Sequence, residues 1–220
     1  MSGGAIGAKP RASYHHGELR RSLIAATRRL VGERGEDRFS LADACRAAGV
    51  TTAAPYRHFA DKDELLQAVV AEGFLELTQR TRDAAARHPG GSEARVLEIG
   101  RTYLAFGLAE PALFRMMFAQ TPGRSVSALV NEHGRACFEA VLDEVSAYGH
   151  AHRIGSDARI VALQLWSFVH GVTGLVSGRG YAEVAPDLDV DHLLATAAER
   201  LLFSLPRRGS ESPGTGPQGP

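Results

Sequence analysis

The sequence predicts an all-α protein of about nine helices, in which a long helix joins a small three-helix amino-terminal head to a larger helical body. Three observations support this fold class. Apolar residues recur at helical spacing almost throughout, helix caps and Gly or Pro punctuate the chain, and no strand pattern of any length occurs. A chain of 220 residues is long enough to bury a sizeable core and hold one or two domains.

The first helix is expected over residues 16–34, ending at Gly35. Its inward-facing stripe consists of Leu19, Leu23, Ala26 and Leu30. The preceding residues 1–13 are rich in Gly, Ala and Pro and carry two basic side chains, so they are predicted to form a disordered basic arm. Such an arm could follow a nucleic-acid backbone or be an inert tail, and the sequence favours neither.

A helix-turn-helix is expected next. Ser40 and Asp43 have the spacing of a capping box for a helix that Gly49 ends, because a left-handed C′ residue is cheap only for glycine. After this glycine-containing turn, Thr51 or Thr52 begins a second short helix with Pro55 in its first turn.

The third cap is Asp61, with Glu64 expected to complete a second capping box. The helix that begins there continues to about residue 87, so it belongs to both the head and the body. We therefore place the domain boundary without a flexible linker, assigning residues 14–66 to the head and 67–205 to the body. Residues 206–220 are predicted to be a disordered tail.

The body is expected to contain five further helices. Their approximate ranges are 92–108, capped by Ser92, 111–118, 125–147, 157–178, capped by Ser156 or Asp157, and 187–205. The helix over 157–178 is apolar almost all round and must be covered on all sides. In a domain of this size that predicts a partner subunit, with a four-helix bundle of the last two helices from each copy. The predicted interface residues are Val172, Leu175, Leu194 and Leu201.

The charge distribution indicates a polyanionic partner although the net charge is zero. Residues 9–57 carry ten basic and five acidic side chains, whereas residues 58–220 carry fifteen basic and twenty acidic ones. A basic head on an acidic body focuses attraction for nucleic acid on one end of the molecule.

The segments YHHGELRRSLIAATRRLV and GVTTAAPYRHFADKDELL resemble the DNA-binding head of TetR/AcrR transcriptional regulators over roughly residues 14–70. The resemblance implies a DNA-binding transcriptional regulator, most often a repressor, whose dimer places two heads in successive major grooves of a palindromic operator. In this assignment Thr51, Thr52 and Ala53 approach bases, Arg57 lies at the groove edge, and the phosphate contacts are Ser40, Tyr56, His58 and Lys62.

The segments YLAFGLAEPALFRMMFAQ and WSFVHGVTGLVSGRG are similar to the WHG-containing type of TetR carboxy-terminal domain. The resemblance implies a small-molecule effector bound between the body helices. Aromatic and Met side chains with a few polar tips suit a largely apolar ligand, although for any single one of them plain core packing is the favoured explanation. The predicted lining residues are Phe74, Tyr103, Phe106, Phe114, Met117, Phe118, Trp166 and His170.

Other functions have little support. No hydrolase, metalloprotease, P-loop or dinucleotide-binding motif occurs, no His spacing demands a metal, and no cofactor is expected. No signal peptide or apolar run of eighteen residues is found, which predicts a cytoplasmic protein without a membrane partner. Two alternatives stay open. One is an all-α enzyme or binder whose helix-turn-helix only packs, and the other is an activator of the same family.

Overall fold

The computed structural model describes residues 11–51, 58–119, 125–155, 157–178 and 180–203, with side chains from residue 17 onward. In these ranges the regular elements are helices, so the all-α prediction is confirmed. The order is α1 (Arg11–Arg34), α2 (Leu41–Ala48), α3 (Lys62–Ala85), α4 (Glu93–Ala109), α5 (Pro111–Phe118), α6 (Ala128–Ala151), α7 (Ala158–Ser177), α8 (Gly180–Val184) and α9 (Val190–Phe203). The predicted helix after Thr51, residues 1–10 of the predicted arm and the whole predicted tail of residues 206–220 lie outside the described residues, whereas residues 11–13 of the arm are helical.

Helix α1 begins at Arg11, five residues before the predicted start. Pro10 directly precedes this point in the sequence, and proline is favoured at the very start of a helix. The predicted stripe is confirmed: Leu23, Ala26 and Leu30 are buried and Leu19 is half-buried. The helix ends as predicted before Gly35, whose φ of 82° is cheap for glycine.

Both ends of α2 match the prediction. The Ser40 hydroxyl accepts a hydrogen bond from the Asp43 amide, while the Asp43 carboxylate accepts one from the Ser40 amide. Gly49 adopts the left-handed conformation at the other end, with φ of 70°, and its amide donates to the carbonyl of Arg46. These caps satisfy backbone groups that an eight-residue helix cannot satisfy internally.

The cap of α3 differs from the prediction in one detail. Asp61 accepts a hydrogen bond from the Glu64 amide at 2.8 Å, as expected. However, the Glu64 carboxylate accepts from the amide of Ala60, not from that of Asp61, so the reciprocal capping box is wrong. Ala60 lies in the bend before the helix, and it is its amide, one residue before the N-cap, that bonds to the Glu64 side chain.

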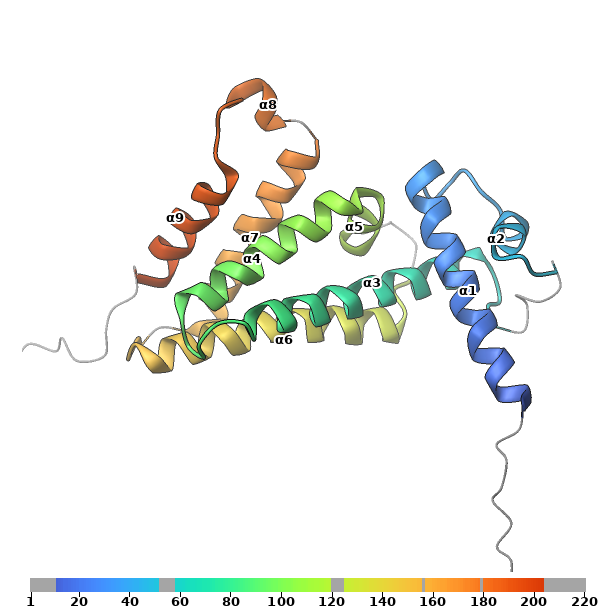
Figure 1. Ribbon diagram of the computed structural model, residues 1–220, viewed down its shortest axis with the longest axis horizontal. Helices are drawn as coiled ribbons and strands as arrows, with labels where there is room; N and C mark the ends of the chain where they lie inside the picture. The colour runs from blue at the N-terminus through green and yellow to red at the C-terminus, as the bar shows by residue number, and fades with distance from the viewer. Residues whose placement is uncertain (1–10, 52–57, 120–124, 156, 179, 204–220) are drawn as a thin grey trace, which may run out of the picture.

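Helix α3 is continuous and links the head to the body, as Figure 1 shows at the point where α1 crosses it. Leu65, Leu66 and Val69 are buried in one hydrophobic cluster with the head residues Phe39 and Phe59. The same cluster extends to Phe74 and Leu77 in the body. The small head therefore shares its core with α3 instead of closing a core of its own.

The body helices are packed around α3. In Figure 1, α3 and α6 run side by side, α4 lies along α3, and α7 and α9 lie farther from the head.

Pro111 occupies the first turn of α5 and Asp157 caps α7, as predicted. Ser92 occupies the predicted N-cap position of α4 but makes no capping hydrogen bond, and its buried hydroxyl has no partner among the described residues. The short α8 was not predicted.

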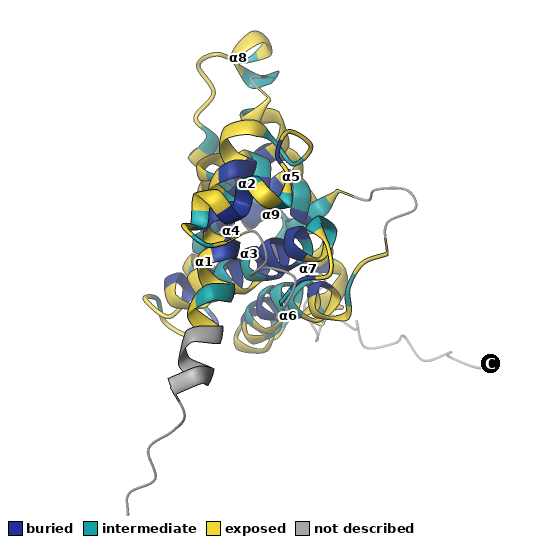
Figure 2. Cartoon of the chain, turned by 90° about the vertical axis from the view of Figure 1, so that its right-hand side faces the viewer, coloured by how far each residue is buried: buried dark blue, intermediate teal, exposed yellow. Residues whose placement is uncertain are grey.

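One face of α7 is uncovered. The helix has the length and mean hydropathy, 1.5, to cross a bilayer, yet only 28% of that stretch is buried. By length and composition alone, α7 is the one such helix in the described ranges. Ile160, Leu163 and Leu175 are exposed large apolar side chains along it. Figure 2 shows how exposed and buried residues alternate around the body helices seen from the head end.

Candidate functional site

The amino termini of α2 and α3 meet in the head. The Lys62 ammonium group, in the first turn of α3, lies 4.4 Å from the centroid of the Phe39 ring. Phe39 directly precedes Ser40, the N-cap of α2. Two helix amino termini and a cation are thus gathered around one aromatic ring, an arrangement that favours a phosphate group.

Ser40 already uses its donors within the head. Its amide and its hydroxyl both donate to the Asp43 carboxylate, at 2.8 and 2.6 Å. These bonds, together with an ion pair to Arg46, hold the pKa of Asp43 well below its usual range. In this structure Ser40 is a cap, and a phosphate at this position must compete with Asp43.

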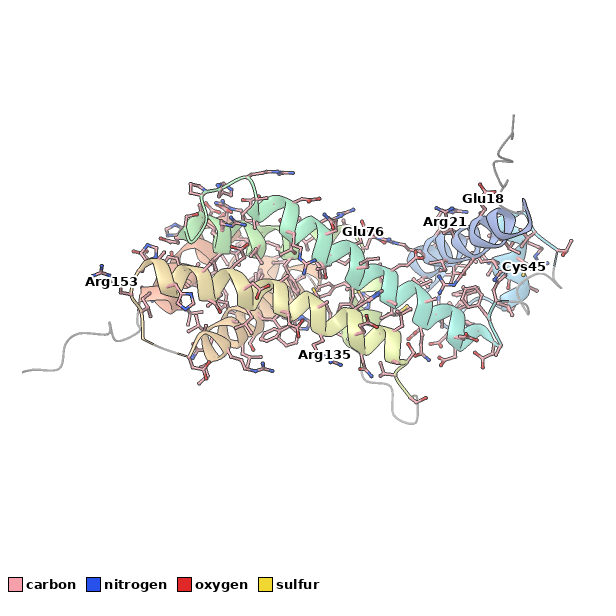
Figure 3. The ribbon with its side chains drawn as sticks, turned by 90° about the horizontal axis from the view of Figure 1, so that it is seen from below. Glu18, Arg21, Cys45, Glu76, Arg135 and Arg153 are labelled. Carbon is pink, nitrogen blue, oxygen red and sulfur yellow. The ribbon has the colours of Figure 1, made fainter. Side chains whose placement is uncertain are left out.

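The structure describes only part of the predicted base-contacting segment. Thr51 is exposed and His58 is half-buried. Thr52, Ala53, Tyr56 and Arg57 lie outside the described residues. The guanidinium group of Arg20 lies 5.4 Å from the centroid of Phe59, so α1 places a basic side chain beside that ring. Figure 3 shows Glu18 and Arg21 on the outer side of α1.

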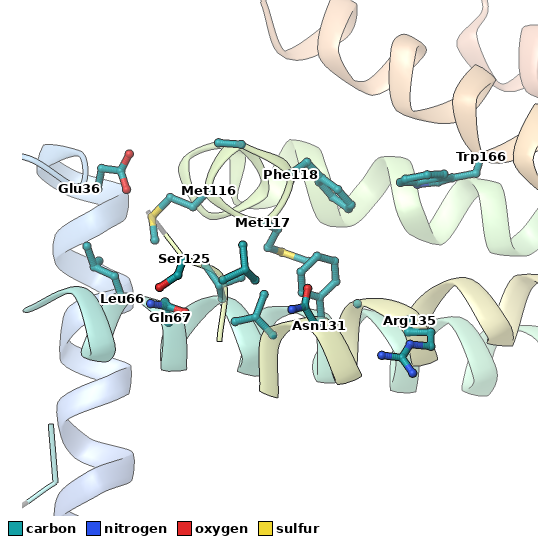
Figure 4. A pocket seen from close by; sticks show the side chains of 16 residues that line it. Glu36, Leu66, Gln67, Met116, Met117, Phe118, Ser125, Asn131, Arg135 and Trp166 are labelled. Atoms are coloured by element: carbon teal, nitrogen blue, oxygen red, sulfur yellow. The ribbon is translucent and has the colours of Figure 1, made fainter. Parts of the chain in front are cut away.

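A cavity of about 390 Å³, here called the outer chamber, lies where the head meets the body. Its lining includes Glu36 from the α1–α2 connection and Leu66 and Gln67 from the start of α3, together with side chains of α5 and α6. Figure 4 shows these groups around the opening, with Met116, Met117 and Phe118 above and Asn131 and Arg135 below. Both parts of the protein therefore contribute to one cavity wall.

A second cavity of about 230 Å³, the inner chamber, continues into the body. The two chambers share Phe74, Phe118, Gly134 and Trp166, which form a neck between them. The inner wall is otherwise mostly apolar and is completed by Thr81, Ile99, Tyr103, Cys137, Phe138 and Val141. Volumes and linings of this kind are typical of small-molecule sites.

The polar groups at the inner wall satisfy each other. The Trp166 indole N–H donates to the Tyr103 hydroxyl at 3.1 Å, and that hydroxyl lies 2.8 Å from Nδ1 of His170. Burial lowers the pKa of His170, which favours a neutral ring whose Nδ1 accepts a hydrogen bond from the Tyr103 hydroxyl. Burial also raises the pKa of Tyr103. The chain of bonds leaves the chamber wall essentially apolar.

The structure places five of the eight predicted lining residues at these chambers: Phe74, Tyr103, Met117, Phe118 and Trp166. The other three do not line either chamber, which corrects the expectation. Phe106 is fully buried, and Phe114 and His170 stack on one another with ring centroids 5.3 Å apart. These side chains share the aromatic composition of the cavity wall, but their helices turn them toward the α4–α5–α7 contact.

Sequence reasoning missed the polar rim of the outer chamber. Gln67 spans α3 and α6, because its side chain donates to Asp63 at 2.9 Å and accepts from the Ser127 amide at 2.5 Å. Asn131 and Arg135 lie one turn apart on α6 and are exposed. Their spacing of four residues was the available signal, since such residues share a helix face.

An ion cluster ties the head to the body beside the chamber. Arg28 of α1 contacts Glu76 of α3, with Nη1 2.6 Å from the carboxylate, and donates through Nε to Glu110 at 2.6 Å. Glu110 is the residue at which α4 ends and α5 begins. These two acids raise the pKa of Arg28, so the charge persists and α5 is held to α1.

Comparison with known proteins assigns the class. Residues 23–69 match bacterial regulatory proteins of the tetR family, and residues 96–201 match a Tetracyclin repressor-like carboxy-terminal domain. A head with converging helix amino termini, joined by one helix to a hollow all-α body, fits the class that these matches give, a DNA-binding transcriptional regulator. The chain belongs to the TetR family.

Solved structures agree with this assignment. A protein of unknown function from Rhodococcus sp. RHA1 is 31% identical, with a TM-score of 0.76 over 87% of this chain and 97% of that one. The TetR-family regulator SCO4454 from Streptomyces coelicolor is 18% identical, with a TM-score of 0.65 over 91% and 97% of the two chains. FadR from Bacillus subtilis, solved with stearoyl-CoA, is 13% identical, with a TM-score of 0.63 over 83% and 97%. The latter two show the fold alone.

Membership of this family excludes one of the two alternatives left open by the sequence. TetR-family regulators act by binding DNA and are not enzymes, which confirms the prediction of a non-enzymatic protein. The alternative in which the helix-turn-helix only packs is therefore excluded. In the described ranges no group of three or more potential metal ligands occurs.

Proposed function

We propose that the protein is a ligand-responsive repressor. It binds a palindromic operator in double-stranded DNA as a cytoplasmic homodimer and is released by a small, largely apolar effector. The observation that supports this most is the outer chamber, because Glu36 and Leu66 of the head region share its wall with α5 and α6 of the body. A molecule bound there contacts both parts and can change the orientation of the head relative to the body.

In this proposal residues 14–66 bind DNA, and residues 67–205 bind the effector and the second subunit. The base contacts are Thr51, Thr52 and Ala53, with Arg57 at the groove edge, and the phosphate contacts are Ser40, Tyr56, His58 and Lys62. Heads of a dimer entering successive major grooves would lie about 34–36 Å apart. The finer assignment of the body to the WHG-containing type stays a prediction.

The Arg28 cluster is the proposed mechanical link. An effector in the outer chamber displaces the α5 side chains Met116 and Met117, and Glu110 at the start of α5 passes that shift to α1. A coupling of about 1–3 kcal/mol is enough to change operator occupancy. FadR from Bacillus subtilis, which holds stearoyl-CoA, has the same fold, which supports an apolar effector.

The uncovered face of α7 supports the dimer. Ile160, Leu163 and Leu175 are exposed along it, and Gly171 and Gly174 leave open space for a partner helix. Leu175 is 50% exposed, whereas Val172 and Leu194 are only 3% and 5% exposed and point into the subunit's own core. The predicted interface thus needs adjustment: Val172 and Leu194 support the surface, and their exposed neighbours form it. Leu201 is half-buried at the edge of this surface.

Sedimentation tests the dimer. Leu175→Asp places a charge in the proposed interface and should yield monomers. The matched control is Leu75→Asp, because Leu75 is similarly exposed, at 55%, but lies on α3. A Leu175→Asp variant that stays dimeric would move the interface elsewhere.

DNA binding is tested by selecting bound sequences from random duplexes. Lys62→Ala should then weaken binding to every selected and unselected duplex alike and reduce the salt slope by about one. Arg153→Ala, just beyond the carboxy end of α6 and far from the head, serves as the control and should change neither. Altered base preference in Lys62→Ala would contradict the phosphate role.

Release is tested on the selected duplex. An effector should compete with it in a gel-shift titration, and indifference would remove the ligand-responsive part of the proposal. The remaining alternative, an activator, predicts that a reporter under the operator loses expression when the protein is absent. A repressor predicts a gain.

A further inference from the structure

The two chambers form one elongated space between α3 and α6. On α3 the lining runs from Leu66 in the outer chamber to Thr81 in the inner one, and fifteen residues of helix span about 22 Å. On α6 it runs from Val130 to Val141 in the same direction. Long and narrow cavities of this kind fit a chain better than a compact, rounded molecule.

The polarity of this space changes along its length. The inner chamber presents aromatic and aliphatic carbon, because the hydroxyl of Tyr103 and the indole of Trp166 bond to each other and to His170. The outer chamber carries Gln67, Ser125, Asn131 and Arg135. A ligand that fits both must have an apolar end inside and a polar end outside.

Arg135 determines the charge of that polar end. Its side chain is exposed on α6 at the neck, and no ion pair joins it to any described residue. The acid at the opposite end of the chamber, Glu36, has a partner within the protein. The unpaired cation therefore favours a carboxylate or another anionic end group.

We infer that the effector is an elongated amphipathic anion, and that its length decides whether the head responds. A short chain fills the inner chamber and leaves its charged end beside Arg135. A longer chain extends that end farther along the outer chamber, toward Gln67 and Glu36. This inference rests on the proposed function, because it places the effector in the same cavity.

The neck explains why the response depends on the length of the ligand chain. Phe74, Phe118 and Trp166 close around Gly134, where an added Cβ would find the nearest atoms of Phe74 3.7 Å away. Space for a chain therefore depends on the missing side chain of Gly134. Beyond the neck, the Gln67 side chain holds α3 to the start of α6, so a ligand that reaches it disturbs the contact between the two helices.

The test uses straight-chain carboxylates of increasing length as probes. Trp166 is the only tryptophan in the chain and lines both chambers, so its fluorescence reports binding directly. Affinity should rise about three- to fourfold for each added methylene group while the chain fills apolar space. In the same samples, release of the selected duplex should begin only above a threshold length, although shorter chains already change the fluorescence.

Alcohols and ammonium compounds of the same chain length separate charge from chain. The carboxylate should bind tightest, and Arg135→Gln should reduce its affinity about tenfold while leaving the alcohol unaffected. Arg115→Gln is the matched control, because Arg115 is exposed on α5 and lines neither chamber. Equal or tighter binding of the ammonium compound would overturn the anionic end group.

Gly134→Leu tests the neck. The added side chain should block passage between the chambers, so that chains of any length no longer release the duplex. Leucine is a good helix former, so folding is retained. If short and long chains release DNA equally well in the unaltered protein, length sensing is wrong. If no chain changes Trp166 fluorescence while the selected duplex still binds, the ligand class is wrong and the DNA-binding function stands.

Discussion

Two glycines of the body have opposite surroundings. A Cβ added at Gly107 on α4 would overlap the Thr173 methyl of α7 and lie 3.1 Å from the Phe114 ring. A Cβ added at Gly134 on α6 would meet nothing closer than 3.7 Å. The α4–α7 contact is therefore closed at Gly107, whereas at Gly134 a methyl group would fit in ordinary contact with Phe74, beside the two chambers along the α3–α6 contact. The difference shows that the two larger cavities follow the α3–α6 contact, whereas only a small apolar cavity of about 50 Å³ lies between α4, α7 and α9.

Large-to-small substitutions should give the largest contrast between the two contacts. Phe114→Ala should cost about 3–5 kcal/mol of unfolding free energy, because Phe114 is buried against Tyr103 and His170 in the closed contact. Phe118→Ala should cost clearly less, because Phe118 is half-buried and already borders empty space. Denaturant unfolding measures both, and equal losses would show that the chambers close around Phe118 in solution.

The glycines themselves give the next largest contrast. Gly107→Ala should destabilise the protein by about 1–3 kcal/mol, since the added methyl group forces α4 and α7 apart. Gly134→Ala should be neutral or stabilise it by up to about 1 kcal/mol, because alanine favours a helix and has room there. The same unfolding measurement applies, and a destabilised Gly134→Ala variant would refute the open neck.

The ion cluster joins the closed contact to the head and should have a smaller effect on stability. Arg28→Gln should cost about 1–2 kcal/mol, because it leaves Glu110 without its partner in a half-buried position. Arg80→Gln is the control. Arg80 also pairs with Glu76 but is half exposed, so its loss should cost about 0.5 kcal/mol or less. Similar costs for the two variants would mean that Arg28 is an ordinary surface ion pair.

A pH effect should be the smallest. Burial lowers the pKa of His170 in the folded state, so above the ordinary histidine pKa of about 6.5 the folded and unfolded forms are both neutral. As the pH falls below that value, the unfolded chain takes up the proton more readily and stability declines. His170→Asn should flatten this part of the unfolding profile. An unchanged profile would show that His170 does not contribute.

The sequence determined the features that depend on near neighbours along the chain. The Ser40–Asp43 box, the left-handed Gly49 and the Asp61 cap join residues at most four apart, so spacing alone located them. The apolar stripe of α1 and the shared helix α3 followed from periodicity in the same way. These local rules also carried the resemblance to the TetR family, which residues 23–69 and 96–201 confirm.

The tertiary structure decided which aromatic side chains meet empty space and which residues join the head to the body. Phe114 and Phe118 lie one turn apart, yet Phe114 packs against His170 and Phe118 borders both chambers. Arg28 meets Glu110 across 82 positions of sequence. Helical periodicity gives the face on which a residue lies. How far each helix is rotated against its neighbours is fixed by packing of the whole body, and that rotation separates a filled contact from a cavity.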